Sequence, residues 1–219
     1  MLDALIFDVD GTLAETEELH RRAFNECFAE AGLGWHWSRD DYARLLKTTG
    51  GKERIARHMA EIGASGIDIP ALHAAKTARY TALMAAGGLP LRPGVADLIT
   101  RARSAGKRLA IATTTSRPNV EALCLACFNA PAEAVFDVLA CGDEVAAKKP
   151  APDVFLLALD RLGLPPEACL AFEDSRNGLQ SALGAGLRCI VTPSAYTEGE
   201  DFSGADRILP DLMHFGQVT

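Results

Sequence analysis

Two carboxylates stand two positions apart near the start of the chain, in the stretch DVDGT at positions 8–12. They directly follow the run ALIF at 4–7, whose continuous apolar character is typical of a buried strand. Side chains two apart on a strand share a face, so Asp8 and Asp10 are expected to lie together. Such a pair is unfavourable when buried unless a cation or a shared proton compensates it. The alternative is a solvated turn with two ordinary acids, and the partners that the rest of the chain supplies decide between them.

Hydroxyl-bearing residues mark the end of a second predicted strand, the apolar run at 108–113. Thr113 ends this run, and Thr114, Thr115 and Ser116 follow it. Their hydroxyl and backbone donors suit phosphate oxygens. The alternative is that they cap the following helix, and both interpretations can hold because a helix N-terminus is itself an anion site.

Cations and further carboxylates come from two later segments. Lys148 and Lys149 stand just before a predicted helix. Alone they indicate a solvated turn, but beside two acids and a phosphate they would compensate charge. Glu173 and Asp174 end another predicted strand. Together with the acids at positions 8 and 10 they give an oxygen-rich cluster suited to Mg²⁺, which prefers octahedral oxygen ligands and retains waters.

The elements that must position these side chains alternate between strand and helix from residue 88 onward. Strands are predicted at 108–113, 136–140, 169–172, 188–191 and 207–209, and helices begin near 94, 118, 152 and 175. This alternation predicts an α/β protein with a Rossmann-like, doubly wound, mainly parallel sheet. In such sheets the reactive groups gather beyond the carboxyl ends of the strands, where the polar segments above are found.

A purely helical block interrupts this pattern directly after the first strand. Helices are predicted at about 19–31, 40–46, 53–62 and 70–86, with a flexible polar loop at 47–52. We therefore predict an inserted α-helical cap domain at 15–87, and an α/β core made of 1–14 and 88–219. An insert at this point would cover the two acids.

Composition and charge narrow the class of protein. Of the 219 residues 48% are apolar, which is enough for a sizeable core, and the net charge of −7 argues against broad nucleic-acid or anionic-membrane binding. No run approaches the roughly 18–20 apolar residues of a membrane span. The six cysteines lie mostly in apolar runs and no signal peptide precedes the first strand, so we expect reduced thiols in a cytoplasmic, monomeric protein. Cys124 and Cys127 lack the second pair that a zinc site would need.

The four polar segments resemble, in order, the four motifs of the haloacid-dehalogenase-like hydrolase superfamily. The stretch DVDGT matches motif one, Thr113 motif two, Lys149 motif three, and the pair Glu173-Asp174 motif four. Any one match would be weak evidence. Four in register, each at a predicted strand end, make the resemblance specific and extend it over the whole chain.

The resemblance implies a role for each core residue. Asp8 would attack phosphorus to form an aspartyl-phosphate. Asp10 would protonate the leaving oxygen and then activate water. Thr113 would hydrogen-bond the transferring phosphoryl group, and Lys149 would neutralise charge around Asp8.

The resemblance also implies Mg²⁺ as cofactor. It would be bound by the Asp8 carboxylate, the Asp10 backbone carbonyl and Asp174, with Glu173 as a further ligand or a neighbour of the ligands. The chemistry agrees, because a carboxylate that attacks a phosphoryl dianion needs positive charge around it. Dehalogenation is not expected, since the dehalogenases of the superfamily lack the second aspartate and the metal cluster.

The helical insert resembles the small cap shared by β-phosphoglucomutase and phosphoglycolate phosphatase. Its informative segment is TTGGKER at 48–54. Gly50 and Gly51 let the chain approach a ligand closely, while Lys52 and Arg54 offer cations to a second, uncleaved phosphate. The alternative is a mobile loop with solvated charges.

Further substrate contacts are expected on both sides of the cleft. Glu17 and His20 lie three apart on one side of a predicted helix, and both could reach a sugar hydroxyl. His20 could equally be a structural residue of the hinge. Opposite them, Thr115, Ser116 and Arg117 are expected to complete the pocket.

Within the superfamily, the amino-acid sequences of these segments look most like those of the CbbY family. Its members are phosphatases that convert xylulose 1,5-bisphosphate, an inhibitory by-product of Rubisco in the Calvin cycle, to xylulose 5-phosphate. A β-phosphoglucomutase would use the same aspartates and metal but pass the phosphoryl group to a second sugar position, and the core motifs do not separate the two. An inactive binding protein with this fold would lack an essential acid, and none is missing.

Overall fold

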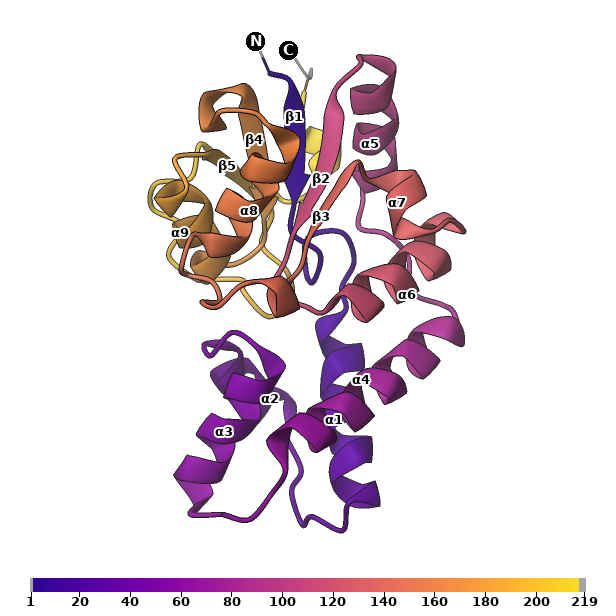
Figure 1. Ribbon diagram of the computed structural model, residues 1–219, viewed down its shortest axis with the longest axis vertical. Helices are drawn as coiled ribbons and strands as arrows, with labels where there is room; N and C mark the ends of the chain where they lie inside the picture. Colours follow the sequence, from indigo (N-terminus) through magenta and orange to yellow (C-terminus); the bar gives the residue numbers. More distant parts are fainter. Residues whose placement is uncertain (1, 217–219) are drawn as a thin grey trace.

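The computed structural model describes residues 2–216, which form a central sheet, helices on both of its faces and a helical lobe at one end (Figure 1). All six strands pair in parallel in the order β3-β2-β1-β4-β5-β6. They are β1 (Ala4–Phe7), β2 (Arg108–Ala112), β3 (Val138–Ala140), β4 (Cys169–Glu173), β5 (Arg188–Val191) and β6 (Arg207–Ile208). The predicted fold class is confirmed. Because the strand order reverses at β1, a crevice is expected beyond the carboxyl ends of β1, β2 and β4.

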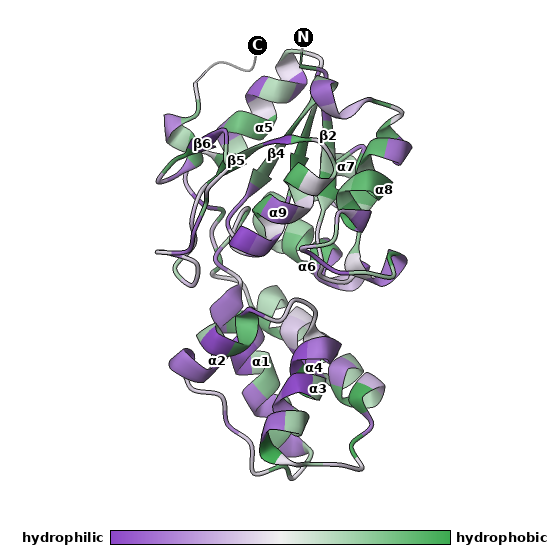
Figure 2. Cartoon of the chain, turned by 90° about the vertical axis from the view of Figure 1, so that its left-hand side faces the viewer, coloured by the Kyte–Doolittle hydropathy of each residue, from purple (hydrophilic) through white to green (hydrophobic). Residues whose placement is uncertain are grey.

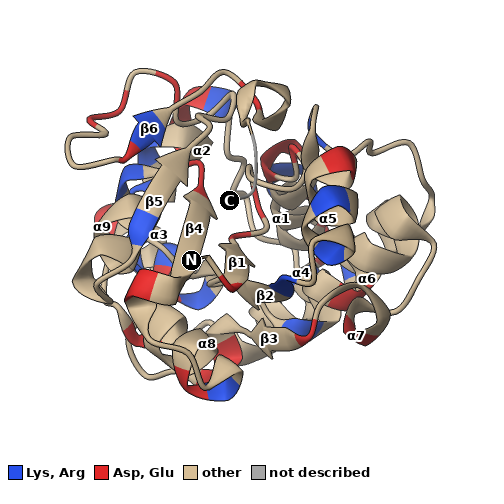
Figure 3. Cartoon of the chain, turned by 90° about the horizontal axis from the view of Figure 1, so that it is seen from above, with Lys and Arg blue, Asp and Glu red and all other residues tan. Residues whose placement is uncertain are grey.

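Alternating side chains bury both faces of the sheet. On β1, Leu5 and Phe7 pack into one apolar cluster, and Ala4 and Ile6 into another. The first cluster lies under α5 (Val95–Ser104), α6 (Arg117–Phe128) and α7 (Ala132–Val135), and the second under α8 (Asp153–Leu162) and α9 (Arg176–Gly184). In Figure 2 the strands are accordingly largely hydrophobic while the helices carry both colours. In Figure 3 acidic and basic positions are interspersed on the helices that surround the sheet.

The first four of the five helices between β1 and β2 form a lobe at the carboxyl end of the sheet, which we call the cap (Figure 1). They are α1 (Glu17–Glu30), α2 (Arg39–Leu46), α3 (Gly51–Ile62) and α4 (Ile69–Ala85). The cap has its own apolar cluster around Phe24, Phe28, Trp37 and Tyr42. The chain leaves and re-enters the core through two adjacent linkers, because Ala14 forms a bridge with Leu91.

Two predicted boundaries were wrong. The strand predicted from 136 begins at Val138, because Phe136 packs edge-on against Phe128 and follows the short helix α7. The loop predicted at 47–52 ends earlier, since Gly51 and Lys52 already form the first turn of α3. All six cysteines are free, and no helix among residues 2–216 is long and apolar enough to cross a membrane.

Candidate active site

A cavity of about 570 Å³ lies between the carboxyl ends of the strands and the cap. Asp8, Asp10, Lys149 and Asp174 line its core side. Residues from α1, α3 and α4 line the opposite side. The sheet topology brings these core residues together. Asp8 and Asp10 follow β1, Asp174 follows β4, and Lys149 precedes α8.

The ammonium of Lys149 joins two carboxylates at the floor of the cavity. Its Nζ lies 2.6 Å from Asp8 Oδ1 and 2.6 Å from Glu173 Oε1, and it donates to the Ala112 carbonyl at 2.8 Å. Burial alone would lower the pKa of Lys149, but the two carboxylates raise it above its ordinary value. Lys149 is therefore a permanent cation beside Asp8.

Three carboxylates nevertheless cluster here, and Lys149 contacts only two of them. Carboxylate oxygens of Asp8, Glu173 and Asp174 all lie within 4.8 Å of one another. Burial, opposed by Lys149, raises the pKa of Asp8 to about 8, and burial beside Asp8 and Glu173 raises the pKa of Asp174 well above its ordinary value. Without a further cation these crowded acids therefore favour their protonated forms, and a cluster of ligands made of oxygen atoms alone fits Mg²⁺, which would stabilise the charged forms.

Asp10 turns away from this cluster toward the cap. Its Oδ1 accepts a hydrogen bond from Thr16 Oγ1 at 2.5 Å and lies 3.0 Å from His20 Nε2. Burial would raise the pKa of Asp10, but His20 and Thr16 outweigh it and lower the pKa to about 2. The carboxylate of Asp10 is thus a charged, oriented group, separate in its partners from that of Asp8.

The cap places a cationic region at the other end of the cavity. Gly50, Gly51 and Lys52 line the cavity where α3 begins, and a helix N-terminus favours anions. Arg54 is buried, and its Nη1 donates to the Tyr42 hydroxyl at 3.0 Å. The cavity therefore has positively charged side chains both on its core side and on its cap side.

The comparisons with known proteins agree with this geometry. Residues 2–186 match the haloacid dehalogenase-like hydrolase family. The chain is 63% identical over 213 residues to protein CbbY of Rhodobacter capsulatus, covering 96% of this chain and 94% of the relative. The chain belongs to the haloacid dehalogenase-like hydrolase family. Its predicted membership of the CbbY group and its class, a phosphatase-type hydrolase, are thereby confirmed.

Solved structures of this family share the whole architecture. A CbbY variant from Rhodobacter sphaeroides, in complex with xylulose 1,5-bisphosphate, has a TM-score of 0.96 and 58% identity, covering 100% of this chain and 98% of that one. A putative β-phosphoglucomutase from Thermotoga maritima has a TM-score of 0.71 and 26% identity, covering 95% and 94%. The fold is thus common to both kinds of enzyme that the sequence resembles.

Most of the predicted substrate-binding residues of this hydrolase meet at the cavity. Its lining includes Thr114, Thr115, Ser116, Glu17 and His20. Thr113 lies behind them, fully buried, with its Oγ1 accepting from the Thr115 amide at 3.1 Å. Ser116 lines the cavity, and its hydroxyl is buried without a hydrogen-bond partner within residues 2–216.

Arg117 is the exception among the predicted pocket residues. It opens α6 but is absent from the cavity lining, and its guanidinium forms an ion pair with Glu133 of α7. The structure thus places the Arg117 side chain beside α7 and outside the cavity lining, and its contact with substrate stays a prediction.

Lys76 of α4 is a cavity residue that the sequence reasoning missed. Its Nζ lies 2.6 Å from His20 Nδ1 and sits over the rings of Phe24 and Tyr80, at 4.7 and 5.2 Å from their centres. Burial lowers its pKa to about 7. The available signal was its place in an apolar stripe, since residues 72, 76, 80 and 84 form the buried face of α4.

Proposed function

We propose that this hydrolase removes the phosphate on the first carbon of xylulose 1,5-bisphosphate, releasing xylulose 5-phosphate and inorganic phosphate. The observation that carries the proposal is the two-ended cavity. One end has the Asp8–Lys149 pair for the phosphate that is cleaved, and the other has Lys52, Arg54 and the start of α3 for a phosphate that is retained. The complex of the Rhodobacter sphaeroides relative with this bisphosphate supports the choice of substrate.

The arrangement of the carboxylates supports a division of labour between them. Asp8 attacks phosphorus and forms an aspartyl-phosphate, while Lys149 neutralises the charge that gathers there. Asp10 is charged in the empty site, and the negative charge of a bound phosphate beside it favours uptake of a proton by its carboxylate. Oriented by Thr16 and His20, Asp10 gives this proton to the leaving oxygen and then takes a proton from the water that hydrolyses the intermediate. Thr113 and the hydroxyls that follow it hold the phosphoryl oxygens.

A magnesium ion completes this site in our proposal. Asp8, Asp174 and the Asp10 backbone carbonyl would hold it, with Glu173 between them and Lys149. When bound, Mg²⁺ supplies the positive charge that the attack of one anion on another requires.

In the same proposal, residues 15–87 form the cap that closes over the substrate. Removal of an inhibitory bisphosphate places the reaction beside Rubisco in the Calvin cycle. The free thiols fit a reducing cytoplasm.

The test separates a phosphatase from a mutase by its products. The protein is incubated with xylulose 1,5-bisphosphate and Mg²⁺, and separately with β-glucose 1-phosphate plus a trace of glucose 1,6-bisphosphate. We expect inorganic phosphate from the first mixture, none after excess chelator, and no glucose 6-phosphate from the second. Glucose 6-phosphate without phosphate release from the bisphosphate would show that the chain is a mutase.

A further inference from the structure

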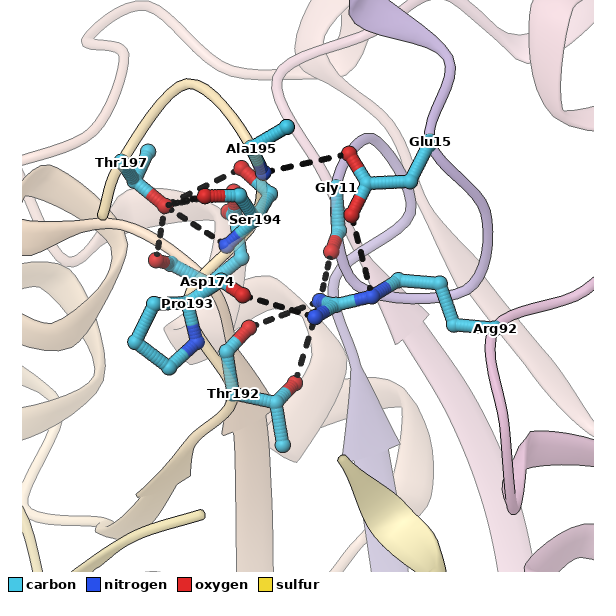
Figure 4. A network of polar contacts seen from close by, with 9 residues as sticks. All are labelled: Gly11, Glu15, Arg92, Asp174, Thr192, Pro193, Ser194, Ala195 and Thr197. Carbon is cyan, nitrogen blue, oxygen red and sulfur yellow. Dashed lines mark hydrogen bonds and ion pairs between the residues drawn. The ribbon is translucent and has the colours of Figure 1, made fainter. Parts of the chain in front are cut away.

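Arg92 lies in the linker through which the chain returns from the cap, next to the bridge between Leu91 and Ala14. Its side chain is only 10% exposed and forms the centre of the network in Figure 4. Nη1 donates to the carbonyls of Gly11 and Thr192, the latter at 2.7 Å, and Nη2 donates to the Pro193 carbonyl at 2.7 Å. One buried guanidinium therefore joins the loop after β1 to the loop after β5.

On its opposite edge the same guanidinium reaches the outgoing cap linker. Nε lies 3.2 Å from Glu15 Oε1, and Glu15 Oε2 accepts from the Ala195 amide at 3.4 Å. Both cap linkers and the loop after β5 are thus held by one ion pair and its hydrogen bonds.

Both loops that Arg92 holds lie against the predicted metal carboxylate. Gly11 has a φ of +84°, and a Cβ there would lie 2.2 Å from Asp174 Oδ2. In the loop after β5, the Ser194 amide donates to Thr197 Oγ1 at 2.9 Å, and that hydroxyl lies 2.7 Å from the Asp174 carbonyl and 3.3 Å from Asp174 Oδ2. Asp174 is therefore clamped between two segments whose separation Arg92 sets.

We propose that Arg92 is a positioning residue for the magnesium site. It holds the Asp10–Gly11 main chain and the 192–197 segment at the distance that lets the Asp10 carbonyl and the Asp174 carboxylate bind one ion. Arginine suits this role because its planar head presents several donors in fixed directions, whereas the single ammonium of lysine cannot reach carbonyls on both loops in the same geometry. The inference rests on the metal assigned in the proposed function.

Calorimetric titration with Mg²⁺ alone tests the role without relying on activity. Partners of metal ligands typically change metal affinity by about 10- to 100-fold when they are replaced. For Arg92→Lys we expect the Mg²⁺ dissociation constant to rise about tenfold. Excess Mg²⁺ should restore kcat, and KM for the substrate should change little. Arg101→Lys is the matched control, because Arg101 also pairs with an acid, Asp97, and donates to two carbonyls, but at the far end of α5.

The outcomes separate the inference from the function on which it rests. A merely structural Arg92 would lower the melting temperature and leave the dissociation constant unchanged, which would overturn the inference alone. No Mg²⁺ binding by the unsubstituted protein would overturn the metal assignment and the inference together. If Arg92→Lys does not fold, Thr197→Val breaks the last link to Asp174, and an unchanged Mg²⁺ affinity in that variant would equally refute the proposed route.

Discussion

The core and the cap hold their charged side chains in opposite ways. In the core, Asp8 and Asp174 directly follow the neighbouring parallel strands β1 and β4, and Lys149, from the loop before α8, reaches Asp8 with its ammonium. In the cap, Lys76 and Arg54 are held by aromatic neighbours, with Phe24 and Tyr80 under one and Tyr42 under the other. The positions of the charged core residues therefore follow from the strand order, whereas the positions of the charged cap residues depend on which helix faces pack together.

Removing Asp8, the proposed nucleophile of the core, should have the largest effect. Asp8→Asn keeps the shape of the side chain but not its nucleophilicity, so we expect turnover to fall on the order of a thousandfold or more. The fold should persist, because the amide can still accept from Lys149. Phosphate release and thermal unfolding measure the two effects.

Asp3→Asn is the matched control, since Asp3 directly precedes the amino end of the same strand, away from the cavity, and is exposed. It should keep full activity. Normal turnover by Asp8→Asn would exclude an aspartyl-phosphate. It would also remove the distinction between a core that carries the chemistry and a cap that binds the substrate.

The same contrast explains how much the sequence predicted. The parallel sheet follows from the alternation of strands and helices, and the inserted cap from the helical block that interrupts it. The gathering of Asp8, Asp10, Lys149 and Asp174 at one cavity follows from polar segments placed at the carboxyl ends of the strands. Lys76 was missed because its partner His20 lies 56 positions away and only helix packing joins them. The pairing of Arg117 with Glu133 could not be predicted for a related reason, since it also depends on how two helices pack.

Replacing Lys76 by methionine should stabilise the protein in a pH-dependent way. Burial is the main cause that lowers the pKa of Lys76 to about 7, with Arg54 also lowering it and Asp10 and Glu17 opposing. Between pH 7 and about 10.4 the unfolded chain therefore binds a proton that the folded chain does not. The cost of burying this amine is fully present below pH 7 and disappears as the pH rises toward its ordinary pKa.

At pH 6 the free energy of unfolding of Lys76→Met should thus exceed that of the unsubstituted protein by on the order of 2 kcal/mol, after allowance for the lost cation–π contacts. Denaturant titration measures this difference. The difference should shrink by pH 10. Lys52→Met, which changes an exposed lysine, should show no such trend. A gain that is equal at both pH values would mean that Lys76 stays protonated in the fold.

The cationic end of the cap is tested by Lys52→Ala. Losing one charge-assisted hydrogen bond to the retained phosphate corresponds to about 1.4 kcal/mol, so we expect KM for xylulose 1,5-bisphosphate to rise about tenfold. KM for an aryl phosphate, which has no second phosphate, should stay the same. Lys47→Ala, an exposed lysine just before the segment that lines the cavity, is the control. Equal changes in KM for both substrates would show that Lys52 of the cap does not bind the second phosphate.

The smallest expected effect lies where core and cap touch. The Tyr196 hydroxyl, on the loop after β5, donates to Glu18 Oε2 of α1 at 2.7 Å, and its ring packs edge-on against Tyr42 at 5.7 Å. Tyr196→Phe keeps the ring and loses about 1 kcal/mol of hydrogen bonding, so kcat/KM should fall no more than about fivefold. Combining it with Glu18→Ala, which removes the acceptor, in a double-mutant cycle isolates this bond from the pairing of Glu18 with Arg21. A coupling near zero would mean that aromatic packing, rather than the hydrogen bond, joins the two regions at this point.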